Sequence, residues 1–233
     1  KDSLQEIKDA GYTAIQTSPA QACRLGANWD NADKSQTNDT PTWYYLYQPT
    51  YFTLGNDYLG TAEEFKEMCE EAHKLGLKIV VDVVANHLAD VGTDHTDKVD
   101  QTLFSDARTM QNGGQRIEKW NEREQVTQGC CIGMPDINTK SEKSQNIIAN
   151  YLKELVKDGA DGFRFDAAKH IELPSDGSFG SQFWPKIVNG TKAKNSNVFL
   201  YGEILNTAGP ISIGEYMVKY FKEMNQVQIK MDM

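Results

Sequence analysis

The segment LKIVVDVVANH, residues 77–87, decides the class of fold. Its near-continuous run of valine and isoleucine predicts a strand buried on both faces, as strands of parallel sheets are. The segment before it, TAEEFKEMCEEAHKLG (61–76), predicts a helix, because Thr61 and Glu64 form a capping-box pair and Gly76 marks its end. A helix that leads directly into a buried strand is the repeating unit of a parallel α/β sheet.

The same alternation extends on both sides of this segment. Further strands are expected at 13–19, 161–166 and 197–205, and further helices at 141–159, 181–188 and 212–226. Two long connections, residues 20–60 and 88–135, leave from the C-terminal ends of strands. In βα barrels that end of the strands carries the active site, so polar residues at the strand ends should meet there.

The segment DGFRFDAAKH, residues 161–170, alternates apolar and charged side chains. Arg164 and Asp166 would share one face of a strand, and Phe163 and Phe165 the other. Two interpretations follow: a structural ion pair on a half-exposed strand, or a strand end that delivers a carboxylate into an active site. Glu203 ends the next strand, and two carboxyl groups across one bond are what glycoside hydrolysis requires.

The charge and hydropathy of the chain argue against nucleic acid or a membrane as its partner. The chain has 233 residues, a net charge of -9 and a pI near 5.0. An acidic chain without a basic run is a poor match for nucleic acid, and no apolar run approaches the length that spans a membrane. The first residues already predict a helix, so no secretory leader is expected within this sequence. The cysteines match no zinc motif and leave the redox compartment open; they are Cys23, Cys69, Cys130 and Cys131.

Four short motifs, in order, are similar to those of the α-amylase family of retaining glycoside hydrolases: DVVANH (82–87), MPDIN (134–138), GFRFDAAKH (162–170) and GEIL (202–205). The similarity runs through nearly the whole chain and is closest to secreted bacterial α-amylases. It implies an α/β fold of the (β/α)8 TIM-barrel type, with an excursion domain after the third strand. Residues 1–88 would be the first part of the barrel without its first strand, 89–135 the excursion, and 136–233 the continued barrel.

The resemblance also implies roles for individual residues. Asp166 matches the nucleophile and Glu203 the general acid/base, while Arg164 keeps the nucleophile ionised. Seven residues are expected to bind substrate: Trp43, Tyr44 and Tyr47 as an aromatic platform, His87 and His170 toward sugar hydroxyls, Lys169 on the aglycone side, and Arg164.

A calcium site is implied by the same resemblance. Asn86 and Asp136 match side-chain ligands, and Thr127 and His170 match residues that bind the ion through their backbone carbonyls. Ca²⁺ prefers oxygen ligands of these kinds. The ion would fix the 88–135 excursion against the barrel and take no part in the chemistry.

Together these observations predict endo-acting hydrolysis of α-1,4-glucosidic bonds in starch-like glucans by a secreted monomer. The family's third acid lies in a His-Asp dipeptide, which this sequence lacks, and only four barrel strands are recognisable where the closed fold has eight. Two alternatives therefore stay open. One is a truncated, non-catalytic remnant that binds glucan or calcium, and the other is a transglycosylase of the same fold.

Overall fold

A computed structural model describes residues 3–26, 29, 43–90, 96–103 and 116–204 of the chain. The strands are β1 (Ala14–Thr17), β2 (Gln21–Cys23), β3 (Pro49–Leu54), β4 (Lys78–Val84), β5 (Gly162–Asp166) and β6 (Phe199–Gly202). The α-helices are α1 (Leu4–Asp9), α2 (Trp43–Leu46), α3 (Ala62–Lys74), α4 (Arg123–Gln128), α5 (Glu142–Lys157) and α6 (Phe183–Lys192). Short 3-10 turns occur at Thr96–Lys98, Gln101–Leu103, Ala168–His170 and Gly177–Phe179. The helix expected at 212–226 lies outside the described residues.

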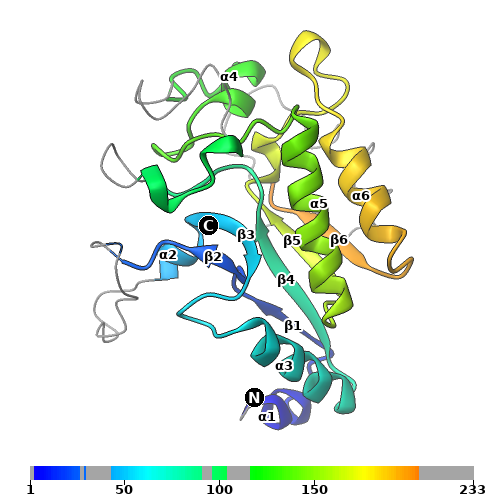
Figure 1. The fold of residues 1–233 in the computed structure, drawn as a ribbon. Coiled ribbons are helices and arrows are strands. Elements are labelled where there is room, and N and C mark those ends of the chain that lie inside the picture. The colour runs from blue at the N-terminus through cyan, green and yellow to red at the C-terminus, as the bar shows by residue number, and fades with distance from the viewer. Residues whose placement is uncertain (1–2, 27–28, 30–42, 91–95, 104–115, 205–233) are drawn as a thin grey trace.

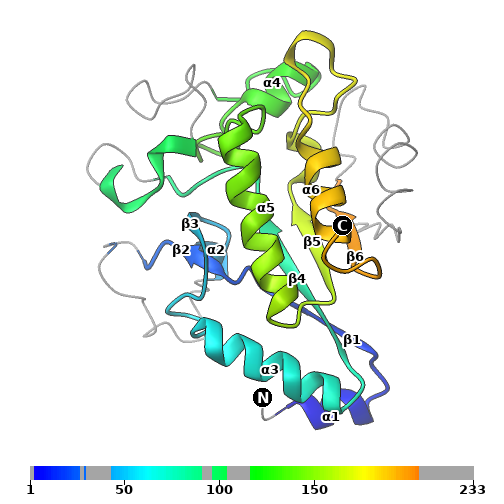
Figure 2. The ribbon, with the colours of Figure 1, turned by 45° about the vertical axis from the view of Figure 1, so that its right-hand side comes forward.

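Four strands form one parallel sheet in the order β1-β4-β5-β6 (Figure 1). This is the order in which they occur along the chain, so each strand lies beside the next strand of the alternating pattern. The helices α3, α5 and α6 lie along the same face of the sheet (Figures 1 and 2). Parallel strands in sequential order with helices on one face are the arrangement of a (β/α)8 barrel, here present in part.

The expected helix and strand at 61–87 are confirmed. Thr61 Oγ1 accepts a hydrogen bond from Glu64 N at 3.2 Å, and Glu64 Oε2 accepts one from Thr61 N at 2.8 Å, which completes the capping box before α3. Every residue of β4 after Lys78 is buried. The strand is therefore covered on both faces, as its valine-rich composition predicts.

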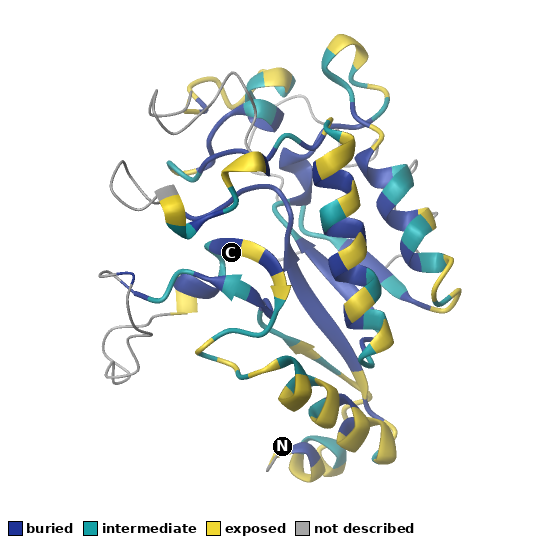
Figure 3. Ribbon diagram, viewed as in Figure 1, coloured by how far each residue is buried: buried dark blue, intermediate teal, exposed yellow. Residues whose placement is uncertain are grey.

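The core lies between the sheet and the helices (Figure 3). Phe163 and Phe165 of β5 are fully buried, and the ring of Phe165 contacts Trp184 of α6 edge-on at 5.3 Å. Helix α5 contributes the stripe Ile148, Tyr151, Leu152 and Leu155. Burying a large apolar side chain is worth roughly 1.5–3 kcal/mol, so these residues hold the helices on the sheet.

The opposite face of the sheet carries a row of polar side chains. Asp82, Arg164 and Tyr201 occupy matching register positions on β4, β5 and β6. The Tyr201 hydroxyl donates a hydrogen bond to the Gln16 side chain on β1. Two strands that are separated by two others in the sheet thus meet across its inner face, which requires the sheet to curl as a barrel wall does.

The connection of residues 20–60 contains an antiparallel pair, β2 with β3, which the sequence patterns do not predict. Phe52 of β3 contacts Tyr151 of α5 at 5.9 Å between ring centroids and so fixes this strand pair to the barrel helices. The segment after β4 lies beyond the carboxyl ends of the strands, together with α4 (Figure 1). Within the described residues, none of the helices has the length and apolar character that crossing a bilayer demands.

Candidate active site

Arg164 is the centre of a charge cluster at the carboxyl ends of β4, β5 and β6. Its Nη1 lies 2.6 Å from Asp82 Oδ2 and 3.0 Å from Asp166 Oδ1, and its Nη2 lies 2.9 Å from Glu203 Oε1. Burial alone would lower the pKa of the guanidinium, but the three carboxylates hold it above its ordinary value. One permanent cation is therefore shared by three acids.

Asp166 is the last residue of β5, and only 14% of its side chain is exposed. Burial raises the pKa of its carboxyl to about 6, and the charge of Glu203 adds to the increase while Arg164 opposes it. At neutral pH the group is ionised and poorly hydrated. A carboxylate in that state is suited to attack an electrophilic carbon.

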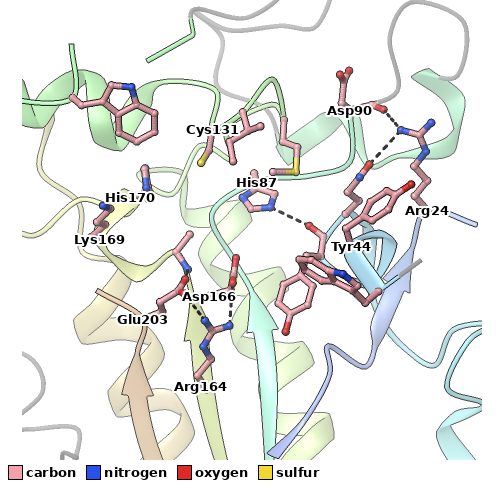
Figure 4. Close-up of a pocket in the computed structure, with 17 residues that line it drawn as sticks. Arg24, Tyr44, His87, Asp90, Cys131, Arg164, Asp166, Lys169, His170 and Glu203 are labelled. Atoms are coloured by element: carbon pink, nitrogen blue, oxygen red, sulfur yellow. Dashed lines mark hydrogen bonds and ion pairs between the residues drawn. The ribbon is translucent and has the colours of Figure 1, made fainter. Parts of the chain in front are cut away.

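Glu203 directly follows β6 and is fixed at two points. Its backbone N–H donates to Phe165 O at 2.8 Å, and its Oε2 accepts from Ala167 N at 3.2 Å. Ala167 has a positive φ of 47°, so the chain turns sharply after Asp166 and directs that N–H toward Glu203. The turn places the two carboxyl groups on the same side of the sheet edge, with Arg164 between them (Figure 4).

Asp82 is a completely buried third acid below this pair. Its Oδ2 accepts hydrogen bonds from Arg164 and, at 2.9 Å, from the Tyr47 hydroxyl. Burial raises its pKa to about 6 against the effect of Arg164. The same interaction ties the Tyr47 ring to the floor of the site, and burial together with Asp82 raises the pKa of that phenol.

The histidines His87 and His170 are both neutral at pH 7, because burial lowers the pKa of each to about 4. His87 Nε2 lies 3.1 Å from the Tyr47 carbonyl, which can only accept, so this nitrogen carries the proton. By the same argument His170 Nδ1 is protonated and donates to Val126 O at 2.9 Å. His170 therefore keeps Nε2 as a possible hydrogen-bond acceptor, whereas His87 Nδ1 already faces the Asn86 side-chain Nδ2 at 3.4 Å.

An aromatic cluster forms one side of the site. Trp43 and Tyr44 of α2 are 61% and 40% exposed, and Tyr47 follows the same helix. The Trp43 ring contacts the Tyr47 ring at 5.8 Å and the Tyr44 ring at 6.3 Å, edge-on in both cases. Exposed aromatic faces of this kind match the apolar faces of sugar rings.

These side chains line one cavity of about 840 Å³ (Figure 4). Every residue that the sequence nominates for catalysis or substrate binding is brought there: Trp43, Tyr44, Tyr47, His87, Arg164, Asp166, Lys169, His170 and Glu203. Lys169 is buried, and this burial lowers the pKa of its ammonium group. Figure 4 shows Lys169 and His170 on one side of the two carboxyl groups and Tyr44 on the other.

Further residues line the cavity that the sequence patterns did not nominate: Arg24, Gln48, Asp90, Trp120, Cys131, Ile132, Met134 and Ala167. Most of them belong to the two long connections, whose paths no periodicity predicts. Trp120 packs edge-on against His170 at 5.9 Å and is 42% exposed. A tryptophan in a polar excursion is the one signal in the sequence that could have identified it.

The four residues expected to bind calcium are buried, and the structure brings them together as two pairs. His87 and Asp136 form an antiparallel bridge, and Ile137 N donates to Asn86 O at 2.9 Å, which sets Asn86 beside Asp136. The His170–Val126 hydrogen bond likewise brings Thr127 to His170. In the described structure, Asn86 Oδ1 is buried and has no hydrogen-bond partner, as an oxygen reserved for a cation would be.

The donor set fits Ca²⁺ by its chemistry, since it offers one carboxylate, one amide oxygen and two backbone carbonyls. Among the described residues there is no group of three or more histidine, cysteine, aspartate or glutamate side chains that could hold a metal. A site built mainly from amide and carbonyl oxygens would not form such a group.

Comparison with known proteins gives a consistent result. Residues 2–226 match the family model of the alpha amylase catalytic domain. An alpha-amylase of Clostridium acetobutylicum is 40% identical over 222 residues, covering 93% of this chain and 27% of that protein. An alpha-amylase of Butyrivibrio fibrisolvens is 35% identical over 231 residues, covering 88% of this chain and 22% of that protein. The chain thus spans about a quarter of the length of these relatives.

Solved structures share the fold. The alpha-amylase of Geobacillus thermoleovorans, complexed with acarbose, superposes with a TM-score of 0.69 at 24% identity, covering 96% of this chain and 42% of that one. The cyclomaltodextrin glucanotransferase CldA gives a TM-score of 0.71 at 20% identity, covering 94% and 44%.

Proposed function

The chain belongs to the alpha-amylase catalytic-domain family, and from that premise we propose that it hydrolyses internal α-1,4-glucosidic bonds of starch-like glucans with retention of configuration. The observation that carries the proposal is the pairing of Asp166 and Glu203 on one guanidinium at the edge of the cavity. Two carboxyl groups close together beside a sugar-sized cleft support a double displacement.

In the first step, Asp166 attacks the anomeric carbon while Glu203, which must have taken up a proton before this step, gives that proton to the leaving glycosidic oxygen. Arg164 favours the ionised form of Asp166, which burial disfavours, so the nucleophile is charged but not stabilised by water. The glycosyl ester on Asp166 then reacts with water, from which Glu203 takes a proton. The second displacement restores the original configuration at the anomeric carbon.

The remaining cavity residues bind and orient the glucan. Tyr47, anchored by its bond to Asp82, presents its ring to the sugar that is cleaved, and Trp43 and Tyr44 extend that platform. Neutral His170 hydrogen-bonds a sugar hydroxyl through Nε2, the nitrogen that the backbone does not use. His87 contacts the sugar from the cavity wall, while Asn86 and the Tyr47 carbonyl hold its two ring nitrogens. Lys169 lies on the side of Glu203, where the leaving portion of the glucan departs.

We also propose that Asn86, Asp136 and the carbonyls of Thr127 and His170 hold Ca²⁺. When bound, the ion supplies positive charge and fixed geometry to the wall of the cleft. The buried Asn86 Oδ1 without a hydrogen-bond partner in the described structure supports this assignment. The same proposal divides the chain into barrel residues 1–88 and 136–233 and an excursion at 89–135. Secretion and a monomeric state remain predictions.

The test is an assay of starch and maltooligosaccharide hydrolysis by the chain, with the variants Asp166→Asn and Glu203→Gln. We expect cleavage by the wild type and a loss of at least about 10³-fold in each variant, since each removes a group that acts in the transition state. Wild-type protein that binds maltooligosaccharide without cleaving it would favour a non-catalytic remnant. Longer products from transfer to sugar would favour a transglycosylase.

A further inference from the structure

A tight turn of four residues, Cys131 to Met134, lies at the rim of the cavity. Met134 N donates a hydrogen bond to Cys131 O at 2.9 Å, and the two residues form an antiparallel bridge. The central residues Ile132 and Gly133 both have positive φ, 53° and 88°. This is the pattern of a type I′ turn, for which Asn-Gly is the favoured central pair.

Ile132 is poorly suited to this position. A β-branched side chain in the left-handed region crowds its own backbone, and only three described residues other than glycine have a positive φ. Burial does not compensate for the strain, because Ile132 is 85% exposed, more than any other large apolar residue in the described structure. Neither turn propensity nor core packing therefore explains an isoleucine here.

The cavity does offer an explanation. Cys131, Ile132 and Met134 all line it. Asp166, Lys169 and Glu203 line the same cavity, so the turn and the catalytic carboxyl groups share one space. In Figure 4 Cys131 lies above Asp166, and Arg164 lies below it at the floor of the cavity. The turn is thus a wall that faces the strand ends across the space a ligand would fill.

We propose that Ile132 is a substrate-contact residue that packs against the apolar face of a glucan ring in the cleft, and that the strained turn is retained for this contact. The inference rests on the proposed function, because it takes an α-glucan as the occupant. Strained residues concentrate at functional sites, where a required side-chain position outweighs the local cost. A bound sugar would bury the side chain that the free protein leaves in water.

The proposal predicts opposite changes in stability and binding. Ile132→Asn installs the favoured Asn-Gly pair, and Ile132→Gly removes the side chain and its strain. Both should raise the melting temperature, by roughly 2–4 °C for a chain of this size. Both should also weaken the binding of maltoheptaose by roughly four- to fifteenfold, the effect of losing one or two buried methylene groups.

The experiment measures thermal melting and calorimetric maltoheptaose binding for wild type, both Ile132 variants and Leu59→Asn. Leu59 is a matched control because it is 51% exposed and lines a different cavity; its variant should bind as the wild type does. Wild-type affinity in both Ile132 variants would overturn this inference alone, as would a lower melting temperature in both. No binding by wild type and control would overturn the proposed function, and this inference with it.

Discussion

Arg164 connects carboxyl groups from three strands, and its single charge cannot fully stabilise all of them. Burial leaves the pKa of Asp82 and of Asp166 near 6, although each carboxylate touches the guanidinium. The folded protein therefore keeps two ionised acids at neutral pH in positions where their ionisation costs stability. Such a cost is expected where a reactive group must be charged and poorly hydrated.

Replacing Asp166 with an uncharged residue should change the free energy of unfolding by the amount that its ionisation costs. The pKa of Asp166 is raised from 3.8 to about 6 on folding, so the folded state binds more protons between these values and stability falls as pH rises through that window. Asp166→Asn should therefore be more stable than the wild type at pH 7, by on the order of 2 kcal/mol. The advantage should be small at pH 4 and vanish below about pH 3, where the carboxyl is protonated in both the folded and the unfolded state.

Urea unfolding at pH 4 and pH 7 checks this prediction. Asp161→Asn is a suitable control, because Asp161 has the opposite behaviour. Burial opposes its ionisation, but hydrogen bonds from Ile79 N, Lys78 and His73 leave its pKa lowered. That variant should lose stability at pH 7. An Asp166→Asn protein that is less stable than the wild type at pH 7 would refute the electrostatic description of the cluster.

Much of the residue-scale chemistry is predictable from short motifs. The alternation in residues 161–166 places Arg164 and Asp166 on one face, as the structure confirms. The additional bond from Arg164 to Asp82 depends on the register between β4 and β5, which no local pattern specifies. The bond from Tyr47 to Asp82 likewise depends on the path of the 20–60 connection.

At the scale of elements, β5 and β6 approach closely because Gly162 has no side chain. A Cβ at this position would lie 2.5 Å from Phe199 O and 2.9 Å from Phe199 Cβ. Contact with a backbone carbonyl cannot be relieved by a rotamer change. The pairing that brings Glu203 beside Asp166 therefore depends on a glycine at the start of β5.

Gly162→Ala should destabilise the protein by about 1–3 kcal/mol, as overpacking of a core does. Gly190→Ala is a matched control within α6, where the nearest atom to an added Cβ is Lys153 Cε at 3.9 Å. The control should gain roughly 0.5–1 kcal/mol from the better helix propensity of alanine. Chemical denaturation of both variants checks the prediction, which fails if the two substitutions have the same sign.

The expected elements agree with the structure where periodicity is strong and disagree where it is weak. The stripes of α3 and α5 and the valines of β4 are long, regular signals, and all three elements are present. The antiparallel β2–β3 pair has a register shift between each of its successive residue pairs, and β3 begins with a proline. Neither strand therefore shows a clean period of two.

At the scale of the whole molecule, the proposed calcium site links the excursion to the barrel. Its residues are far apart in sequence, so only the folded chain presents them together, and Ca²⁺ should stabilise the native state. The gain is about 2.7 kcal/mol at a hundredfold excess over Kd. Asp136→Ala removes the only carboxylate of the set and should abolish the response, whereas Asp166→Ala should keep it.

Thermal melting with calcium and with a chelator measures this response in the wild type and both variants. A wild-type melting temperature that the chelator leaves unchanged would contradict the site. So would an Asp166→Ala protein that loses the calcium response while Asp136→Ala retains it.

Sheet order and helix placement also follow from the sequence at this scale, because sequential βα units allow few arrangements. The curl of the sheet is harder to predict. The curl brings Tyr201 on β6 into hydrogen-bond contact with Gln16 on β1, and these residues are 185 positions apart in the sequence. The shape of the cleft depends in addition on the connections at 20–60 and 88–135, whose conformations are set by tertiary contacts such as Phe52 with Tyr151.

The stereochemistry of the product tests the central claim most directly, namely that Asp166 and Glu203 act as nucleophile and acid/base in a double displacement. Proton NMR of maltoheptaose cleavage, followed faster than mutarotation, identifies the first anomer formed at the new reducing end. Two inversions at one carbon predict that the α-anomer appears first, and that Asp166→Asn forms neither anomer. Initial release of the β-anomer would contradict the account, because it requires water to attack directly and leaves Asp166 no role as nucleophile.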